Sequence, residues 1–307
     1  MKKIQDYSRL IIIGNGFDLM HDLPTSFTEN FKPIAQYFEQ GSGFWDYYGH
    51  GDDLWSSFEI ALGNPDFNEL FEILSSYYPD YLSDHESDRD GIITQVDLVG
   101  HLKDALNAFA SAAEEALYDI GPLKNVCNFF TPNDYFVSFN YTSTLETIYD
   151  IRRSKVFYPH GIINETELIM GYENGEFYPE PIYEVIKDKM PPREYSNINE
   201  YFDNIEDYYV RTAYENLYDK VYNFNKTPRI HDLVAFIERL DIREVVIIGH
   251  SCKIDFVYFE IINTFFKEIE WNVYYYSDDD LENAKLLCNH LGLDELKVNL
   301  IKNLFNL

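Results

Sequence analysis

The stretch LIIIGNGFDLMHDLPTSF, residues 10–27, decides the fold class of this chain. Its first four residues are an uninterrupted apolar run, which predicts a strand buried on both faces. Gly14, Asn15 and Gly16 follow at once, and glycine lets a backbone turn sharply and approach a neighbour or a ligand, because it has no Cβ. A helix is predicted next, over residues 25–38. This order of strand, glycine-rich turn and helix begins many nucleotide-binding α/β folds, in which phosphate lies at the helix N-terminus.

The glycine turn departs from two common phosphate-binding motifs. The dinucleotide fingerprint needs a third glycine, and Leu19 stands at that position. A P-loop needs Gly-Lys-Ser/Thr after the turn, which this stretch lacks. A plain tight turn after a core strand is therefore the alternative to nucleotide binding.

The rest of the chain alternates between the two kinds of element. Further strands are predicted at residues 135–139, 155–158, 167–170, 244–248 and 271–276. Further helices are predicted at residues 54–62, 67–78, 95–117, 143–150, 230–240, 255–267 and 281–291. The pattern predicts an α/β, Rossmann-like fold, with a mostly parallel sheet, helices on both faces and helical insertions.

We expect a single domain over residues 1–307, with a helical insertion at about 54–118. The segment 174–226 is acidic, rich in tyrosine and irregular, and it is the candidate for a lid or an inserted lobe.

Composition limits the classes of partner. The chain has 53 acidic and 24 basic residues, a formal net charge of -29, which disfavours nucleic-acid and anionic membrane surfaces. Cys127, Cys252 and Cys288 form no Cys-x-x-Cys pair, so neither a zinc site nor a disulfide framework is expected. No signal peptide and no apolar run of about 20 residues is present, so we expect a cytoplasmic protein.

Four predicted strands end in small or polar residues: IIIGNGFD, FVSFNYT, VFYPHG and VVIIGHS. In a parallel sheet the carboxyl ends of the strands lie along one edge, which is where ligands bind in open α/β folds. One such ending is weak evidence, but four together predict a site.

These endings carry a resemblance to the AbiH family, bacterial proteins tied to abortive infection by phage. The matching pieces are IIIGNGFDL with the following LPTSF, then LWSSFE, FNYTSTLE, YPHG, and IIGHS with Asp255. They occur in the family's order over nearly the whole chain. AbiH proteins in turn look like remote relatives of the sirtuin fold, so the resemblance implies a sirtuin-like domain that consumes NAD.

The sirtuin resemblance implies roles for residues at the first three strand ends. Gly14 and Gly16 would lie against the NAD pyrophosphate, with Asn15 where alanine is usual. Asn140 would orient the nicotinamide ribose or the attacking water, and His160 matches the catalytic histidine.

Further positions complete the implied site. Thr142 stands where an aspartate is often found, which puts that hydrogen bond in doubt. Gly249 and Ser251, which flank His250, would hold the adenosine side of the dinucleotide. Asp18 and Asp255 belong to the AbiH pattern, and Asp18 has no sirtuin counterpart.

The chemistry is reasonable without the family. Breaking the nicotinamide–ribose bond builds positive charge on the sugar, as in glycoside hydrolysis. An asparagine can hold ribose hydroxyls, and a histidine can serve as a general base near neutral pH. Sirtuin-type deacylases carry a zinc module with paired cysteines, so hydrolysis of NAD to nicotinamide and ADP-ribose is favoured, with no metal expected.

Alternatives remain open. Taken alone, Asn140 is typical of a helix N-cap residue, and His160 is typical of a histidine in a turn. The protein could bind a nucleotide without turnover, as a sensor or toxin partner in phage defence. GHSCK resembles an esterase nucleophile elbow but has Lys253 where the motif has glycine; its partners would be His290 and one of Asp255, Asp278 and Asp294. A homo-oligomer and a phage-derived trigger are further expectations from sirtuin-like defence proteins.

Overall fold

The computed structural model describes residues 7–39, 44–48, 53–63, 65–66, 69, 98–172, 202–266, 269–293 and 298–302. The chain divides into two compact units. Unit 1 contains Met1–Ser26, Phe109–Ile169 and Thr227–Leu307, and unit 2 contains Phe27–Ala108 and Met170–Lys226. Each unit is described by itself.

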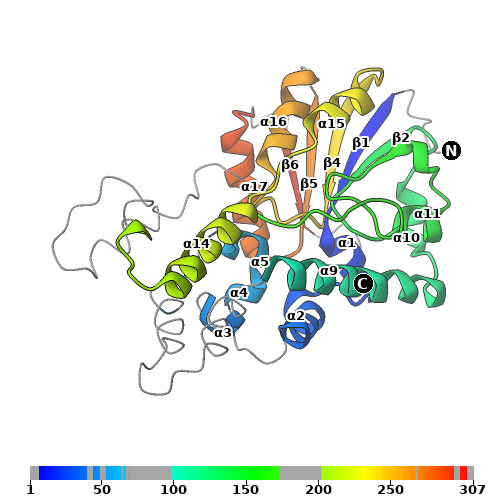
Figure 1. Cartoon of the computed structure of the whole chain (residues 1–307). Coiled ribbons are helices and arrows are strands. Elements are labelled where there is room, and N and C mark those ends of the chain that lie inside the picture. Colours follow the sequence, from blue (N-terminus) through cyan, green and yellow to red (C-terminus); the bar gives the residue numbers. More distant parts are fainter. Residues whose placement is uncertain are drawn as a thin grey trace. The chain divides into compact units, whose positions relative to one another are not determined.

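Unit 1 is built on one parallel sheet of six strands. The strands are β1 (Ser8–Ile13), β2 (Asp134–Ser138), β3 (Val156–Phe157), β4 (Ile242–Ile248), β5 (Glu270–Tyr275) and β6 (Val298–Lys302). They lie in the order β3-β2-β1-β4-β5-β6, and each neighbouring pair is parallel (Figure 1). The predicted α/β, Rossmann-like fold is confirmed.

The strand order places a switch point between β1 and β4. The chain runs outward from β1 through β2 to β3, then returns to the other side of β1 and runs outward again through β5 to β6. The chain therefore continues from β1 and from β4 toward opposite edges of the sheet, and the space beyond the carboxyl ends of these two strands is where ligands bind in such sheets.

Helices cover both faces of this sheet, because alternate residues of each buried strand point to opposite sides. Leu10 and Ile12 belong to a core cluster with α15 (Ile230–Ile237), α16 (Phe256–Phe265) and α17 (Asp278–His290). Ile11 and Ile13 belong to a second cluster, with residues of α1 (Asn15–Leu19), α10 (Lys124–Phe129) and α11 (Thr144–Tyr149). Two short 3-10 helices, Leu117–Asp119 and Arg153–Lys155, complete the regular elements described in unit 1.

Unit 2 is helical where it is described. Its elements are a π-helix at Phe27–Phe31, α2 (Lys32–Phe38), α3 (Phe44–Tyr48), α4 (Asp53–Ser56), α5 (Phe58–Ala61) and α14 (Tyr208–Asn223), and α9 (Leu98–Ala116) begins in it. Its core is aromatic: Trp55 stacks on Phe58 with ring centroids 5.1 Å apart, and Phe31 and Trp45 meet Phe58 edge-on. Much of the predicted insertion at 54–118 and the described part of 174–226 fall in this unit.

Some predicted elements differ from the structure. The strand predicted at 167–170 is wrong, because the Ile169 N–H donates to the His160 carbonyl and Gly171 has a φ of +156°. The helix predicted at 54–62 is two short helices, separated at Ser57. Strand β6 and the helices α1, α3, α10 and α14 are not expected from the sequence; α14 corrects the expectation that the segment 174–226 is irregular throughout. The predicted helix at 67–78 lies outside the described residues except for residue 69, and residues 173–201 of the predicted lid lie outside them entirely.

In the part of the chain that the structure describes, no helix is both long enough and apolar enough to cross a membrane.

Candidate functional site

The loops leaving β1 and β4 meet at the switch point through their glycines. The N–H of Gly14 donates to the Ile248 carbonyl at 3.0 Å, and the N–H of Gly16 donates to the Gly249 carbonyl at 2.8 Å. A Cβ on Gly14 would lie 2.4 Å from the His250 Cα, and one on Gly249 would lie 2.4 Å from the Phe17 nitrogen. Gly249 also has a φ of +66°, which favours glycine. The glycines therefore allow two backbones to touch.

This geometry bears on the predicted pyrophosphate contact. The two glycine N–H groups that could face an anion are already donated to carbonyls of the neighbouring loop. Asn15 is held as well, because its Nδ2 donates to the Thr25 carbonyl at 2.8 Å. Packing thus accounts for the glycines without a ligand, and the pyrophosphate contact stays a prediction.

A buried carboxylate joins the ends of β3 and β4. Asp255 immediately precedes α16, has a φ of +68° and is 0% exposed. Its Oδ1 lies 2.9 Å from Nε2 of His160, and its Oδ2 lies 3.5 Å from Nε2 of His250. Two imidazoles from different strand ends therefore share one aspartate.

The proton position on His250 follows from its other nitrogen. The backbone N–H of Cys252 donates to Nδ1 of His250 at 3.0 Å, so Nδ1 carries no proton while this bond is present. The neutral ring then carries its proton on Nε2, the atom turned toward Asp255. Phe139 packs edge-on against both rings, with centroids 4.7 Å from His250 and 5.2 Å from His160. The bond from Cys252 therefore sets the tautomer of His250, with Nε2 turned toward Asp255.

A second buried carboxylate lies at the ends of β1 and β2. Asp18 is 1% exposed; its Oδ2 accepts from Thr142 Oγ1 at 2.5 Å and its Oδ1 from Thr144 Oγ1 at 2.8 Å. Burial raises the pKa of Asp18 to about 6, although the two hydroxyls and the nearby Asn140 amide oppose that shift. Asp18 belongs to α1, so these hydroxyls tie α1 to the loop after β2.

Asn140 is the residue whose bonding is incomplete. It is 5% exposed, and within the described part of the chain neither its Nδ2 nor its Oδ1 makes a hydrogen bond of ordinary geometry. Its amide lies close enough to Asp18 to favour the charged carboxylate. Buried polar groups in native proteins are almost always paired, so an amide of this kind indicates a missing partner such as a ligand.

The remaining predicted site residues lie apart from these contacts. Ser251 is exposed, and Cys252 is buried, with burial raising the pKa of its thiol to about 12. The histidine proposed for an esterase triad, His290, contacts Glu260 at 2.6 Å. The described contacts therefore give the esterase alternative no triad, and Asp294 lies outside the described residues.

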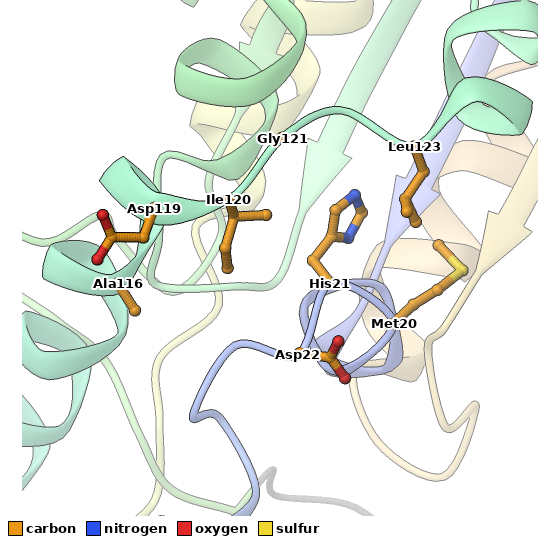
Figure 2. A pocket seen from close by; sticks show the side chains of 8 residues that line it. All are labelled: Met20, His21, Asp22, Ala116, Asp119, Ile120, Gly121 and Leu123. Carbon is orange, nitrogen blue, oxygen red and sulfur yellow. The ribbon is translucent and has the colours of Figure 1, made fainter.

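A pocket of about 420 Å³ lies at the end of α1. Figure 2 shows its lining: Met20, His21, Asp22, Ala116, Asp119, Ile120, Gly121 and Leu123. His21 Nδ1 contacts the Phe17 carbonyl at 2.7 Å, and its Nε2 contacts the Tyr149 hydroxyl at 2.5 Å. Because a carbonyl only accepts, Nδ1 carries the proton, and burial lowers the pKa of His21 so that it stays neutral. Neither Asn140 nor His160 lines this pocket.

Sequence reasoning missed Thr144, His21 and Tyr149. The chain bends at residues 140–142 and Thr144 begins α11, so the spacing of Thr142 and Thr144 does not by itself predict that both hydroxyls face Asp18. The pairing of His21 with Tyr149 joins positions 128 residues apart, and no local pattern marks it.

The arrangement brings the four predicted strand ends together in pairs, as two buried carboxylate clusters. His160 and His250 share Asp255 on the α16 side, and Thr142 and Thr144 share Asp18 on the α1 side. Among the described residues, no group of three metal-ligating side chains could hold an ion.

Comparison with protein families gives one match, to the family model described as bacteriophage abortive infection AbiH, over residues 10–275. Comparison with curated proteins gives no match. The matched region begins in β1 and ends in β5, and it includes all the predicted site residues. The chain therefore belongs to the bacteriophage abortive infection family AbiH, and its role is in abortive infection.

Proposed function

We propose that this protein hydrolyses NAD to nicotinamide and ADP-ribose during abortive infection. The bond between ribose C1′ and the nicotinamide nitrogen breaks, and its electron pair goes to the nicotinamide. A water oxygen bonds to C1′, and the proton released from that water passes to His160. Loss of NAD would stop the metabolism of an infected cell, which is consistent with the family's role in abortive infection.

The observation that carries this proposal is the incomplete bonding of Asn140. A buried amide without ordinary partners costs about 1–3 kcal/mol, so a protein that keeps one has a use for it. The residue lies just beyond β2, one strand away from the switch point where open α/β sheets bind ligands. An asparagine amide both donates and accepts, which suits the hydroxyl groups of a ribose.

The contact between His160 and Asp255 supports a general base. A carboxylate that holds one imidazole nitrogen fixes the ring orientation and stabilises the imidazolium formed when the ring accepts a proton. The Nε2 of His250 lies 3.5 Å from the other oxygen of Asp255. The ring of His160 is 4% exposed, so a bound substrate would reach it only by displacing what covers it.

The test follows nicotinamide release from NAD by liquid chromatography. The purified wild type is compared with His160→Gln and with His231→Gln, which changes an exposed histidine on α15. Each protein is assayed alone and with an extract of phage-infected cells, so that a trigger can act. We expect release by the wild type and by His231→Gln, and a loss of at least 100-fold in His160→Gln with unchanged thermal unfolding.

Two other outcomes would contradict the proposed hydrolysis of NAD. Binding of NAD by calorimetry without release, lost in Asn140→Leu, would favour the sensor and overturn hydrolysis. Neither binding nor release under either condition would overturn the choice of NAD while leaving the family assignment intact.

A further inference from the structure

We propose that Thr25 binds the ligand of this site: its hydroxyl donates a hydrogen bond to a phosphate oxygen of the bound dinucleotide. Only the choice of NAD as that dinucleotide rests on the function proposed above. The place of the hydroxyl rests on contacts within unit 1, which includes Met1–Ser26.

The first step is that Thr25 has a buried hydroxyl without a partner. The residue is 5% exposed, and within the described part of the chain its Oγ1 makes no hydrogen bond. Threonine is a preferred N-cap residue, and a helical segment begins two residues later, at Phe27, yet the hydroxyl makes no capping bond to it. Like the amide of Asn140, a buried hydroxyl of this kind indicates a missing partner such as a ligand.

The second step places this hydroxyl beside the glycine turn. After α1 the chain folds back along that helix: the Leu23 N–H donates to the Asp18 carbonyl at 3.2 Å, and the Thr25 N–H donates to the Leu23 carbonyl at 2.8 Å. The Thr25 carbonyl then accepts from Asn15 Nδ2 at 2.8 Å. Asn15 is the first residue of α1 and stands between the two glycines of the turn. Thr25 is therefore held at the end of α1 that is nearest to β1.

The third step identifies the ligand group. Open α/β sheets that bind dinucleotides hold the phosphates at the turn after the first strand, through backbone N–H groups. Here the N–H groups of Gly14 and Gly16 already donate to carbonyls of β4 and the loop after it, so a phosphate at this turn needs another donor. The Thr25 hydroxyl is a donor without a partner, and it is tied to that turn. The oxygens of a pyrophosphate diester only accept, so the hydroxyl donates.

This arrangement makes Asn15 a positioning residue. Its Nδ2 already donates to the Thr25 carbonyl, so it acts on the ligand through Thr25. Loss of the Asn15 amide should then weaken binding only while the Thr25 hydroxyl is present.

The test replaces the hydroxyl by a methyl group. Thr25→Val keeps the shape of the side chain, Thr25→Ser keeps the hydroxyl, and Thr28→Val makes the same change at an exposed threonine. Calorimetry measures the dissociation constant for ADP-ribose, which carries both phosphates and is not consumed. We expect it to rise at least about 10-fold in Thr25→Val, because a hydrogen bond to a charged group is lost, and to change little in the other two variants. Asn15→Ala should weaken binding in the wild type and add nothing in Thr25→Val.

Inorganic pyrophosphate, used as a competitor of ADP-ribose, identifies the atom that the hydroxyl contacts. Its inhibition constant should rise in Thr25→Val by the same factor. If pyrophosphate competes equally well in Thr25→Val, or if ADP-ribose binds unchanged, the hydroxyl does not hold a phosphate and the inference is wrong.

A second measurement needs no ligand. Because the hydroxyl has no bond to lose in the free protein, Thr25→Val should unfold at the same urea concentration as the wild type or at a higher one. A lower midpoint would mean that the hydroxyl is bonded within the protein, which contradicts the inference.

The inference and the proposed function can fail separately. If ADP-ribose binds through Thr25 but the wild type releases no nicotinamide from NAD, the function fails and the phosphate contact stands. If Thr25→Val releases nicotinamide with an unchanged KM and binds ADP-ribose as the wild type does, the inference fails and the function stands. A wild type that binds neither compound contradicts both.

Discussion

Replacing Gly14 by alanine should destabilise the protein at the switch point, and this effect should not depend on a bound ligand. The new Cβ would lie 2.4 Å from the His250 Cα and 2.6 Å from the Gly249 carbonyl oxygen, both backbone atoms. The two loops must separate, so the hydrogen bonds that Gly14 and Gly16 donate to β4 and its loop are lost. Two hydrogen bonds contribute about 2 kcal/mol, and overpacking costs about 1–3 kcal/mol more. We expect the free energy of unfolding to fall by about 3–5 kcal/mol.

Two other glycines separate the possible causes. Gly292 has a φ of +61° with no atom within 4 Å of an added Cβ, so Gly292→Ala measures backbone strain alone, about 1 kcal/mol. Gly121 has neither a positive φ nor a neighbour within 4 Å, so Gly121→Ala should be neutral or slightly stabilising. Urea unfolding, followed by circular dichroism, gives all three values under one set of conditions.

The result that would refute this reasoning is a Gly14→Ala protein as stable as Gly121→Ala. If that protein had also lost NAD binding, the glycine would serve the ligand directly, as the pyrophosphate prediction holds.

Three further predictions concern buried groups of unit 1. The pKa of Asp18 is raised from 3.8 to about 6, so the folded protein binds this proton more tightly; stability should fall by about 2.5 kcal/mol as pH rises from 4 to 7, and Asp18→Asn should remove that slope in urea titrations. The thiol of Cys252 is buried with its pKa raised to about 12, so native protein at pH 8 should react with a thiol reagent at the exposed Cys127 and not at Cys252, as peptide mapping would show. Arg9 contacts Asp134 at 2.9 and 2.7 Å in the core, so Arg9→Met should lower the free energy of unfolding by about 3–5 kcal/mol.

Each of these three predictions would be contradicted by a specific result. An unchanged pH slope in Asp18→Asn would mean that Asp18 does not titrate near pH 6. Rapid labelling of Cys252 in folded protein would mean that the loop after β4 opens in solution. A mutant at Arg9 that unfolds at the wild-type urea concentration would mean that the ion pair adds nothing beyond apolar packing.

Much of the fold was predictable because the buried strands appear in the sequence as short, continuous runs of apolar residues. The runs at residues 10–13 and 245–248 are apolar on both faces, and each is followed by a glycine. Strand β6 was missed because its burial is partial and its residues alternate weakly, as VNLIK. The prediction of a strand at 167–170 is wrong because the chain there makes a backbone hydrogen bond to His160 and pairs with no described strand. No side-chain pattern indicates such a backbone bond.

The sequence predicted which residues belong to the candidate site better than it predicted which of them contact one another. The strand endings include Asn140 and His160, and the resemblance to AbiH proteins adds Asp255. Which carboxylate holds which group depends on contacts such as His160 with Asp255, 95 residues apart in the chain. The glycines are a second example. Sequence alone does not distinguish a glycine that leaves room for a ligand from a glycine that leaves room for another segment of backbone.

The strand order also sets when the switch point can assemble during synthesis of the chain. Strand β1 lies between β2 and β4, and about 230 residues separate β1 from β4. At about 5–20 residues per second, a ribosome needs on the order of 10–50 s to bridge that gap. Until β4 emerges, the glycine loop has no carbonyls to receive its N–H groups, and Asp255 is not yet present to hold His160. A chain that ends before β4 would therefore lack both the packed glycine loops and the contact between His160 and Asp255.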